Sequence, residues 1–217
     1  MRIGVLGTGN VGRAIGGKLV ELGHEVRMGS RRAGNENAVA WAAEAGEAAS
    51  EGSFADAAGF GELVFNCTAG VASLDALDAA GESALGTKVL VDVANPLDFS
   101  TGMPPALAVC NDDSLGERIQ EAFPQARVVK TLNTMNCLVM VDPARVPGDH
   151  VVFVGGEDEG AKAEVTGLLE SFGWPPGRIL DLGGIASSRG VEMYLPLWLR
   201  LYGTLGTGDL NLAVMRA

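Results

Sequence analysis

The sequence has few of the side chains from which metal sites and disulfide frameworks are built. Among its 217 residues are only two histidines and three cysteines, Cys67, Cys110 and Cys137, which lie far apart and form no CxxC pair. An odd number of dispersed cysteines argues against a disulfide framework and for a reducing compartment. No group of His, Cys, Asp or Glu residues has the spacing of metal ligands. We therefore expect a cytoplasmic protein that holds no metal.

Long hydrophobic runs and an excess of basic residues are also missing. The longest apolar stretch, Val191 to Tyr202, carries Glu192 and Arg200 and is shorter than the roughly 20 residues that a membrane helix needs. The first residues enter a strand-like pattern without a charged leader or cleavage site, so we expect no export signal. The net charge of −11 argues against a nucleic-acid partner, because phosphate backbones bind electropositive surfaces. We expect a soluble protein that binds neither membrane nor nucleic acid.

What the chain does contain is a regular alternation of strand-like and helical segments. Its 217 residues, 47% of them hydrophobic, suffice for one sizeable core but not for two large domains. Several strand-like runs are apolar on both faces, which indicates a parallel sheet covered by helices on both sides. We expect strands at 3–6, 24–28, 63–67, 88–94, 127–132, 151–154 and 178–182, and helices at 10–22, 39–49, 73–80, 114–123, 161–172 and 185–202.

A glycine-rich motif lies between the first expected strand and the first expected helix. Its residues are Gly7, Thr8, Gly9, Asn10, Val11 and Gly12, in the pattern GxGxxG. The first glycine permits a tight turn, the second lets the backbone approach a pyrophosphate, and the third allows close packing of helix on strand. A purely structural turn is the alternative interpretation. In this context the motif predicts an α/β fold with a Rossmann-type doubly wound parallel sheet, to which the length of the chain adds a small helical C-terminal appendage.

The end of the second expected strand indicates which dinucleotide binds. Sites for NAD place an Asp or Glu there to bind the ribose diol, whereas this chain has Ser30, Arg31 and Arg32. A hydroxyl can donate a hydrogen bond and two guanidinium groups can form forked contacts with a 2′-phosphate. Residues 1–32 carry six basic and two acidic side chains, a local charge of +4 in a chain of −11. We predict NADPH rather than NADH; a solvated surface pair of arginines is the alternative.

Small and polar residues follow the later strands. Because ligands of open parallel sheets bind beyond the carboxyl ends of the strands, we expect these residues on the nicotinamide side of the cleft. They supply amides, hydroxyls and small side chains, but no pair of nucleophile and base. We therefore name no catalytic residue, and expect His24 and His150 in a turn and a loop. The strand-end residues are Thr68, Ala69, Asn95, Asn133, Thr134 and Met135.

This scarcity of acids and bases indicates a type of chemistry. Oxidation of an alcohol needs a positioned proton acceptor, whereas a hydride that passes between two stacked redox rings needs mainly proximity and orientation. The spacing of Lys130 and Asn133 imitates hydroxyacid dehydrogenases, but there the pair lies on a helix and here at a strand end. We expect Lys130 to be a structural ion-pairing residue.

Three segments of the sequence show a resemblance to a known family. They are RIGVLGTGNVGRAIGGKLVELGHEVRMGSRR at the start, VVKTLNTMN in the middle, and SSRGVEMYLPLWLRLYGTLGTGDLNLAVM at the end. In this order, through most of the chain, they resemble the NADPH-dependent oxidoreductases that use the deazaflavin coenzyme F420. The chain is also similar to the reductase domain of the six-transmembrane epithelial antigen metalloreductases, which passes hydride from NADPH to a flavin.

The resemblance implies a hydride passed between NADPH and F420, FMN or FAD, and a homodimer. The chain departs from the family pattern at two places, residues 70–73 and Asn136, which replaces a proline. Both places lie on the acceptor side. The resemblance places Thr8, Asn10, Val11, Ser30, Arg31 and Arg32 around NADPH, Ala69, Asn133, Thr134 and Met135 beside the nicotinamide, and Leu210 over the deazaflavin pocket.

The C-terminal part is expected to be an extension of the cofactor domain. We assign residues 1–155 to NADPH binding and residues 156–217 to an α/β extension that completes the acceptor pocket and contributes to a dimer contact. Glu192 is expected to cap or pair locally. The last helix carries an apolar stripe that indicates core or subunit interface, formed by Tyr194, Leu195, Leu197, Trp198, Leu201 and Tyr202.

Two other functions stay open beside hydride transfer to a deazaflavin or flavin. One is an NADPH-dependent dehydrogenase or imine reductase of a small substrate, although such relatives generally add a longer helical domain. The other is a non-catalytic NADPH-binding redox sensor, because the same glycine loop binds the dinucleotide without turnover.

Overall fold

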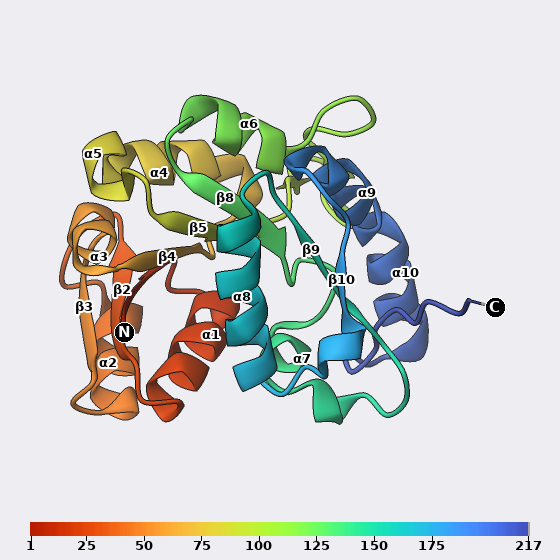
Figure 1. Ribbon diagram of the computed structural model, residues 1–217, viewed down its shortest axis with the longest axis horizontal. Coiled ribbons are helices and arrows are strands. Elements are labelled where there is room, and N and C mark those ends of the chain that lie inside the picture. The colour runs from red at the N-terminus through yellow and green to blue at the C-terminus, as the bar shows by residue number, and fades with distance from the viewer. Residues whose placement is uncertain (217) are drawn as a thin grey trace.

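A computed structural model describes residues 1–216 of the chain (Figure 1). At its centre lies an eight-stranded sheet in the order β3-β2-β1-β4-β5-β8-β9-β10. The crossover from β3 to β4 places the switch point of a doubly wound sheet between β1 and β4. The strands are β1 (Arg2–Leu6), β2 (Glu25–Ser30), β3 (Ala49–Ser53), β4 (Leu63–Asn66), β5 (Val89–Asp92), β8 (Arg127–Thr131), β9 (Val152–Gly155) and β10 (Ile179–Asp181); β6 (Leu97–Asp98) and β7 (Ala106–Leu107) form a separate hairpin.

Helices cover both faces of this sheet (Figure 1). One face carries α1, α2, α7 and α8, and the other carries α3, α4, α5 and α6. The predicted α/β class with a Rossmann-type sheet and C-terminal helices is therefore confirmed. The helices are α1 (Asn10–Glu21), α2 (Glu36–Ala45), α3 (Phe54–Phe60), α4 (Ser73–Ala80), α5 (Glu82–Leu85), α6 (Leu115–Ala122), α7 (Cys137–Val141), α8 (Glu159–Ser171), α9 (Ser188–Met193) and α10 (Leu195–Leu205).

The core is divided into two layers by the alternation of side chains along the strands. In β5, Val89 and Val91 pack on the α1 side, whereas Leu90 packs on the α3 side. Strands buried on both faces read as unbroken apolar runs, which is why β1, β4 and β5 were predictable from sequence. Strand β3 was not predicted, because its segment ASEGS at the edge of the sheet has no large apolar residue.

The later elements differ from the sequence-based expectation in two details. The mostly parallel sheet has one antiparallel pair, β8 and β9; the chain between them contains the short α7 and a 3₁₀ turn (Pro143–Arg145) and re-enters the sheet at the end where it left. The single helix expected at 185–202 is divided into a 3₁₀ turn (Ile185–Ser187), α9 and α10. Pro196 lies in the first turn of α10, where a proline cannot continue the preceding helix because its ring clashes with the carbonyl four residues earlier.

The second helix also begins earlier than expected. The Asn35 side chain accepts hydrogen bonds from Asn37 N and Ala38 N and so caps α2 at Glu36, and Gly46, with φ of +96°, ends the helix. Helix α3 is likewise capped by Ser53, whose hydroxyl accepts a hydrogen bond from Asp56 N. Capping residues thus set helix boundaries that apolar periodicity alone misplaced.

The expected division at residue 155 crosses one continuous sheet. Strand β10 pairs with β9, so the C-terminal segment extends the sheet of the N-terminal one, and the two-part division stays a prediction. Within residues 1–216 no helix combines the length and the apolar character needed to cross a membrane. The cytoplasmic location stays a prediction.

Candidate functional site

Two adjoining hollows lie beyond the carboxyl ends of the strands around the switch point. The N-terminal cleft, about 1000 Å³, is lined by the glycine loop, the segment after β2 and the start of α4. The apolar pocket, about 370 Å³, is lined by residues that follow β4, β5 and β8 and by α10. Cys67, Thr68 and Ala69 line both, so a single extended ligand can reach from one hollow into the other.

The glycine loop between β1 and α1 has the packing of a phosphate cradle. Gly7 adopts φ of +120°, and a Cβ there would lie 2.5 Å from the carbonyl oxygen of Cys67. A Cβ on Gly12 would collide with the carbonyl oxygen of Gly7. Around Gly9, in contrast, no atom lies within 4 Å of the position of a Cβ. The first and third glycines are needed by the fold, and the second leaves open the space that a pyrophosphate would fill.

Helix α1 presents its N-terminus to this space. Its N-cap residue Gly9 supplies no side-chain hydrogen bond, and the first turn has no acidic residue. The first amides of α1 therefore have neither a capping partner nor a repelling carboxylate beside them, which is the arrangement that binds phosphates at helix N-termini. The residues present fit the pyrophosphate of a dinucleotide.

The segment after β2 lines the far end of the N-terminal cleft. Arg31 and Arg32 are exposed, line the cleft and, within residues 1–216, form no ion pair. Ser30 differs from its expected role: it is buried, and its hydroxyl donates a 2.5 Å hydrogen bond to the carbonyl oxygen of Arg32. Ser30 thus fixes the loop that carries the arginines, and its hydrogen is not available to a phosphate in this arrangement.

The apolar pocket has no charged side chain in its lining. Its polar groups are Thr68, Asn95, Asn133 and the indole of Trp198; the other lining residues are small or apolar. Cys67 is buried, and burial together with the nearby Asp92 raises the pKa of its thiol, so that it stays protonated at neutral pH. The lining offers contact area and hydrogen bonds but neither a general base nor an ionised nucleophile.

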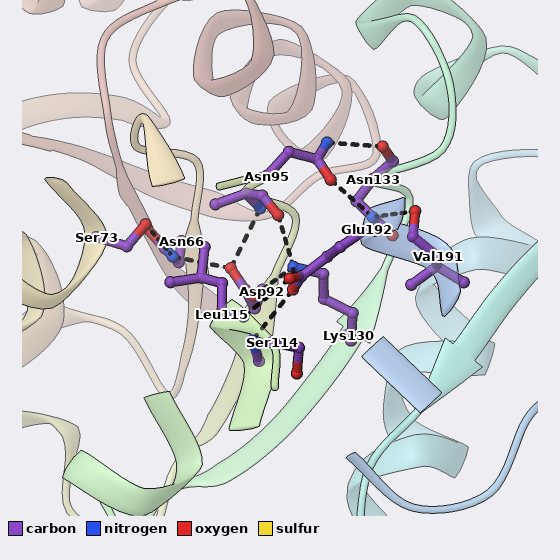
Figure 2. Close-up of polar contacts among 12 residues, drawn as sticks. Asn66, Ser73, Asp92, Asn95, Ser114, Leu115, Lys130, Asn133, Val191 and Glu192 are labelled. Carbon is purple, nitrogen blue, oxygen red and sulfur yellow. Dashed lines mark hydrogen bonds and ion pairs between the residues drawn. The ribbon is translucent and has the colours of Figure 1, made fainter. Parts of the chain in front are cut away.

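A buried ionic cluster of Asp92, Lys130 and Glu192 (Figure 2) lies next to the lining of the apolar pocket, which it contacts at Ala94. Lys130 donates to Asp92 Oδ2 at 2.8 Å, to Ala94 O at 2.6 Å and to Glu192 Oε1 at 2.7 Å. Glu192 also accepts from Leu115 N at 2.8 Å, at the start of α6. Burial alone would lower the pKa of Lys130, but the two carboxylates hold the pKa above its ordinary value. The expectation that Lys130 is a structural ion-pairing residue is confirmed.

Glu192 does not have the local role expected for it. Its carboxylate caps α6 and pairs with Lys130 on β8, both remote in sequence, rather than pairing along its own helix. Burial raises the pKa of Glu192, against the effects of Lys130 and the backbone N–H groups. Sequence spacing gave no sign of this pairing.

Hydrogen bonds connect the cluster to the polar groups of the pocket. Asn66 donates to Asp92 Oδ1 at 2.8 Å and accepts from the Thr68 hydroxyl at 2.7 Å (Asn66 and Asp92 in Figure 2). Asn133 donates to Asn95 Oδ1 at 2.8 Å and to the carbonyl oxygen of Val191 at 3.2 Å. The amides at the ends of β4, β5 and β8 are thus held in fixed orientations.

The structure brings most of the predicted site residues together. The N-terminal cleft includes Gly7, Thr8, Gly9, Ser30, Arg31 and Arg32; the apolar pocket includes Val11, Asn95, Asn133 and Met135; and Thr68 and Ala69 belong to both.

Four predicted residues lie elsewhere. Asn10 faces a separate hollow bordered by α2 and α7, Gly12 is buried under the loop, and Thr134 is buried outside both hollows. Leu210 lies in the tail between Asp209, which pairs with Arg145, and Asn211, which bonds His150. It does not line the apolar pocket, and its ligand contact stays a prediction.

Sequence reasoning missed several residues that line the two hollows. Leu195 and Trp198 were assigned to core or subunit interface, yet both line the apolar pocket, as does Phe99 from the β6–β7 hairpin. Asn35 and Phe54 line the N-terminal cleft. Asn35 is a helix cap and Phe54 follows the capping Ser53, so capping signals could have placed these two.

Comparison with known proteins agrees with this geometry. Residues 2–96 match the family "NADP oxidoreductase coenzyme F420-dependent". A crystal structure assigned as an F420-dependent NADP reductase, from Arthrobacter sp. FB24, is 52% identical, with 99% of each chain covered and a TM-score of 0.92.

More remote similarities extend to other reductases. Metalloreductase STEAP3 of Rattus norvegicus is 29% identical over 205 residues, which are 91% of this chain but 38% of that protein. A reductive aminase from Aspergillus terreus, in complex with NADPH4, cyclohexanone and allyl amine, has a TM-score of 0.63 at 19% identity over 94% of this chain and 62% of its own; this similarity shows the fold alone. The relative from Arthrobacter covers 99% of the chain at 52% identity, and the glycine cradle and the sheet order agree with it. The chain therefore belongs to the family of coenzyme F420-dependent NADP oxidoreductases.

Proposed function

We propose that this protein transfers a hydride between NADPH and a deazaflavin of the F420 type or a flavin. The observation that carries the proposal is the junction of two unlike hollows. A phosphate cradle with two arginines that form no ion pair among residues 1–216 opens, through Thr68 and Ala69, into a pocket lined by described residues without charge. The phosphates of a dinucleotide need the cradle and the arginines, and its nicotinamide and a second flat ring need an uncharged pocket.

The N-terminal cleft would hold the nucleotide part of NADPH. The open space over Gly9 and the amides of α1 suit the pyrophosphate, and Arg31 and Arg32 suit the 2′-phosphate. Thr68 and Ala69 would direct the nicotinamide into the apolar pocket, beside Asn133 and Met135. When bound, the nicotinamide supplies the hydride, and the protein's residues bind, orient and exclude water.

The chemistry of the apolar pocket favours a redox ring as hydride acceptor. Neither His nor Asp, Glu, Lys or Arg lines it, and the thiol of Cys67 is held neutral. Reduction of a carbonyl or an imine benefits from a positioned proton donor, whereas ring-to-ring transfer needs proximity and orientation. The exposed Val71 and Phe99, both in the lining, offer apolar surface to a planar molecule.

Absorbance of NADPH at increasing acceptor concentration tests the proposal. We expect oxidation of NADPH with F420 or with FMN and FAD, and none with a panel of imines and ketones. Turnover with the panel alone would show a small-substrate reductase, and tight NADPH binding without turnover on any acceptor would show a sensor. The Gly9→Ala variant is the control, since it blocks the cradle at a position where the fold has room for a methyl group.

We also propose that the chain forms a homodimer through α10. Leu197, Tyr202 and Leu205 are respectively 56%, 47% and 60% exposed, and they extend the apolar surface of the helix that forms one wall of the apolar pocket. Large apolar side chains clustered on one exposed helix face favour association. A second copy of this chain is the partner that the family resemblance implies.

A further inference from the structure

Behind the lining of the apolar pocket lies a group of three buried charged residues. Asp92, Lys130 and Glu192 are each at most 2% exposed and lie within one ion-pair cluster (Figure 2). Two carboxylates and one ammonium group leave one negative charge in excess if all three are ionised. Buried charges are screened far less by solvent than exposed ones, so this excess acts on whatever occupies the pocket.

The hydrogen-bond partners establish the ionisation states. Asp92 accepts from Asn66 Nδ2, Ala94 N and Lys130 Nζ, and every one of these groups is a donor. Glu192 accepts from Leu115 N, Gly116 N and Lys130 Nζ, which are donors as well. If either carboxyl group were protonated, its hydrogen would point at another donor. Both groups are therefore carboxylates.

Lys130 shows the matching pattern. Its three acceptors, Asp92 Oδ2, Ala94 O and Glu192 Oε1, use all three hydrogens of an ammonium group. The cluster therefore has a net charge of minus one. The N-terminus of α6 compensates part of the Glu192 charge, because a helix N-terminus carries a partial positive charge of about half a unit.

The cluster is connected to residues that line the pocket by a hydrogen bond of one of its members or of that member's neighbour in the chain. Lys130 bonds the carbonyl oxygen of Ala94, and Ala94 itself lines the pocket. The neighbour of Glu192, Val191, bonds Asn133, another lining residue. Since the lining has no charged side chain of its own, no closer charge opposes the cluster.

We propose that the Asp92–Lys130–Glu192 cluster favours the positively charged oxidised nicotinamide over the neutral reduced one. This rests on the proposed placement of the nicotinamide ring in the apolar pocket. When the C4–H bond breaks, its electron pair and hydrogen leave together, and the ring gains one positive charge. The acceptor ring gains the hydride and takes a proton from solvent. A fixed negative charge beneath the pocket stabilises the ring as this charge develops and makes bound NADPH a stronger reductant.

Glu192 and Asp92 thus act as electrostatic positioning residues that touch neither ligand. The effect is confined to the difference between the two redox states of the cofactor. For charges about 10 Å apart at an effective dielectric constant of about 20 to 40, removing one charge changes the ratio of the two dissociation constants roughly 4- to 20-fold. A purely structural role would weaken both redox states equally.

The test measures Kd for NADP⁺ and for NADPH by calorimetry, without any acceptor. In the unaltered protein we expect NADP⁺ to bind at least as tightly as NADPH. Glu192→Gln and, independently, Asp92→Asn bring the cluster to zero net charge, and each should raise the ratio of Kd for NADP⁺ to Kd for NADPH by the factor above. The matched control is Glu121→Gln, which removes one negative charge from an exposed position on α6, outside the cluster, and should leave the ratio unchanged.

The outcomes separate this inference from the proposed function. If the unaltered protein binds neither redox state, the cofactor assignment itself is wrong. If both states bind but the unaltered protein prefers NADPH more than about tenfold, the electrostatic inference alone is overturned. The same holds if Glu192→Gln and Asp92→Asn leave the ratio unchanged, or if Glu121→Gln shifts it as far as they do. Circular dichroism and thermal unfolding confirm that each variant compared is folded.

Discussion

Gly9 and Gly12 lie three residues apart in one loop, yet they face opposite constraints. Gly9 has extended backbone angles (φ −77°, ψ −175°) and open space around a Cβ, whereas a Cβ on Gly12 would collide with the carbonyl oxygen of Gly7. Gly9→Ala should keep or slightly raise the Tm, since alanine in an allowed conformation restricts the unfolded chain. Its methyl group would fill the space proposed for the pyrophosphate, so Kd for NADPH should rise at least about tenfold.

The companion variant Gly12→Ala distinguishes folding from binding. Its added methyl group should lower the Tm, because backbone atoms cannot yield to it as a flexible side chain could. Thermal unfolding and NADPH titration of both variants check the pair. An unchanged Kd for NADPH in Gly9→Ala would show that the space above Gly9 has no role in binding, and equal loss of Tm in the two variants would show that the fold needs both glycines.

At the residue scale, Arg31 and Arg32 are the side chains proposed to select NADPH over NADH. Both line the N-terminal cleft, and no Asp or Glu occupies positions 29–32 to bind a ribose diol. Replacing both with alanine should weaken NADPH at least about 100-fold, because each charge-assisted hydrogen bond contributes about 1.5 to 3 kcal/mol. Kd for NADH should change little, and titration of the protein with each dinucleotide measures the difference.

Arg2→Ala is the matched control for this pair. Arg2 is an exposed arginine at the opposite end of β1, where it pairs with Glu62, so its loss removes the same charge far from the cleft. It should leave both dissociation constants unchanged. Equal weakening of NADPH and NADH by the Arg31 and Arg32 changes would place the 2′-phosphate elsewhere.

At the scale of elements, one ion pair joins α9 to α6 and is sensitive to acid. Arg189 donates to the carboxylate of Glu117 at 2.6 to 3.1 Å, and this hydrogen bond holds the pKa of Glu117 below its ordinary value of 4.5. A lowered carboxyl pKa adds stability that is complete above 4.5 and is lost as the pH falls through the lower folded-state value. Glu117→Gln should therefore flatten the dependence of Tm on pH below 4.5.

The size of this effect is modest because the pair is partly exposed. A pair of this kind contributes up to about 1 kcal/mol, so Glu117→Gln should lower the Tm at pH 7 by roughly 2 to 4 °C or less. Glu121→Gln, an exposed glutamate on the same helix, provides the control with the same change of charge. Thermal scans between pH 3 and 7 would contradict the prediction if both variants behaved alike.

At the scale of the whole molecule, the exposed face of α10 is expected to hold two chains together. Leu197→Glu combined with Leu205→Glu should give a monomer in light scattering, because two charges would be buried in the proposed interface. NADPH binding should persist, since neither residue lines either hollow. Leu22→Glu, at an exposed leucine after α1, is the control and should leave the assembly unchanged. A monomeric unaltered protein would refute the dimer.

Prediction from sequence succeeded where the pattern is local and strongly apolar. The unit β1-α1-β2 was recognisable because Ile3 and Val5 face one layer, Ile15 and Leu19 repeat with helical spacing, and glycines mark the turns. It failed at edge strand β3, which has no large apolar residue, and at the helix expected over 185–202, where Pro196 enforces a new start. It also gave no sign of the hydrogen bond from Ser30 to the carbonyl oxygen of Arg32, because a hydroxyl's partner depends on the conformation of the loop that follows.

The amino-acid order alone determined the dinucleotide cradle, since its glycines and arginines lie within 32 consecutive residues and need only one strand-helix-strand unit to meet. Only the tertiary structure decided what lies beneath the second hollow. There Asp92, Lys130 and Glu192 come from β5, β8 and α9, segments that the sheet order brings side by side. Contacts between remote segments follow from how strands pair and helices pack, and no spacing along the chain records them.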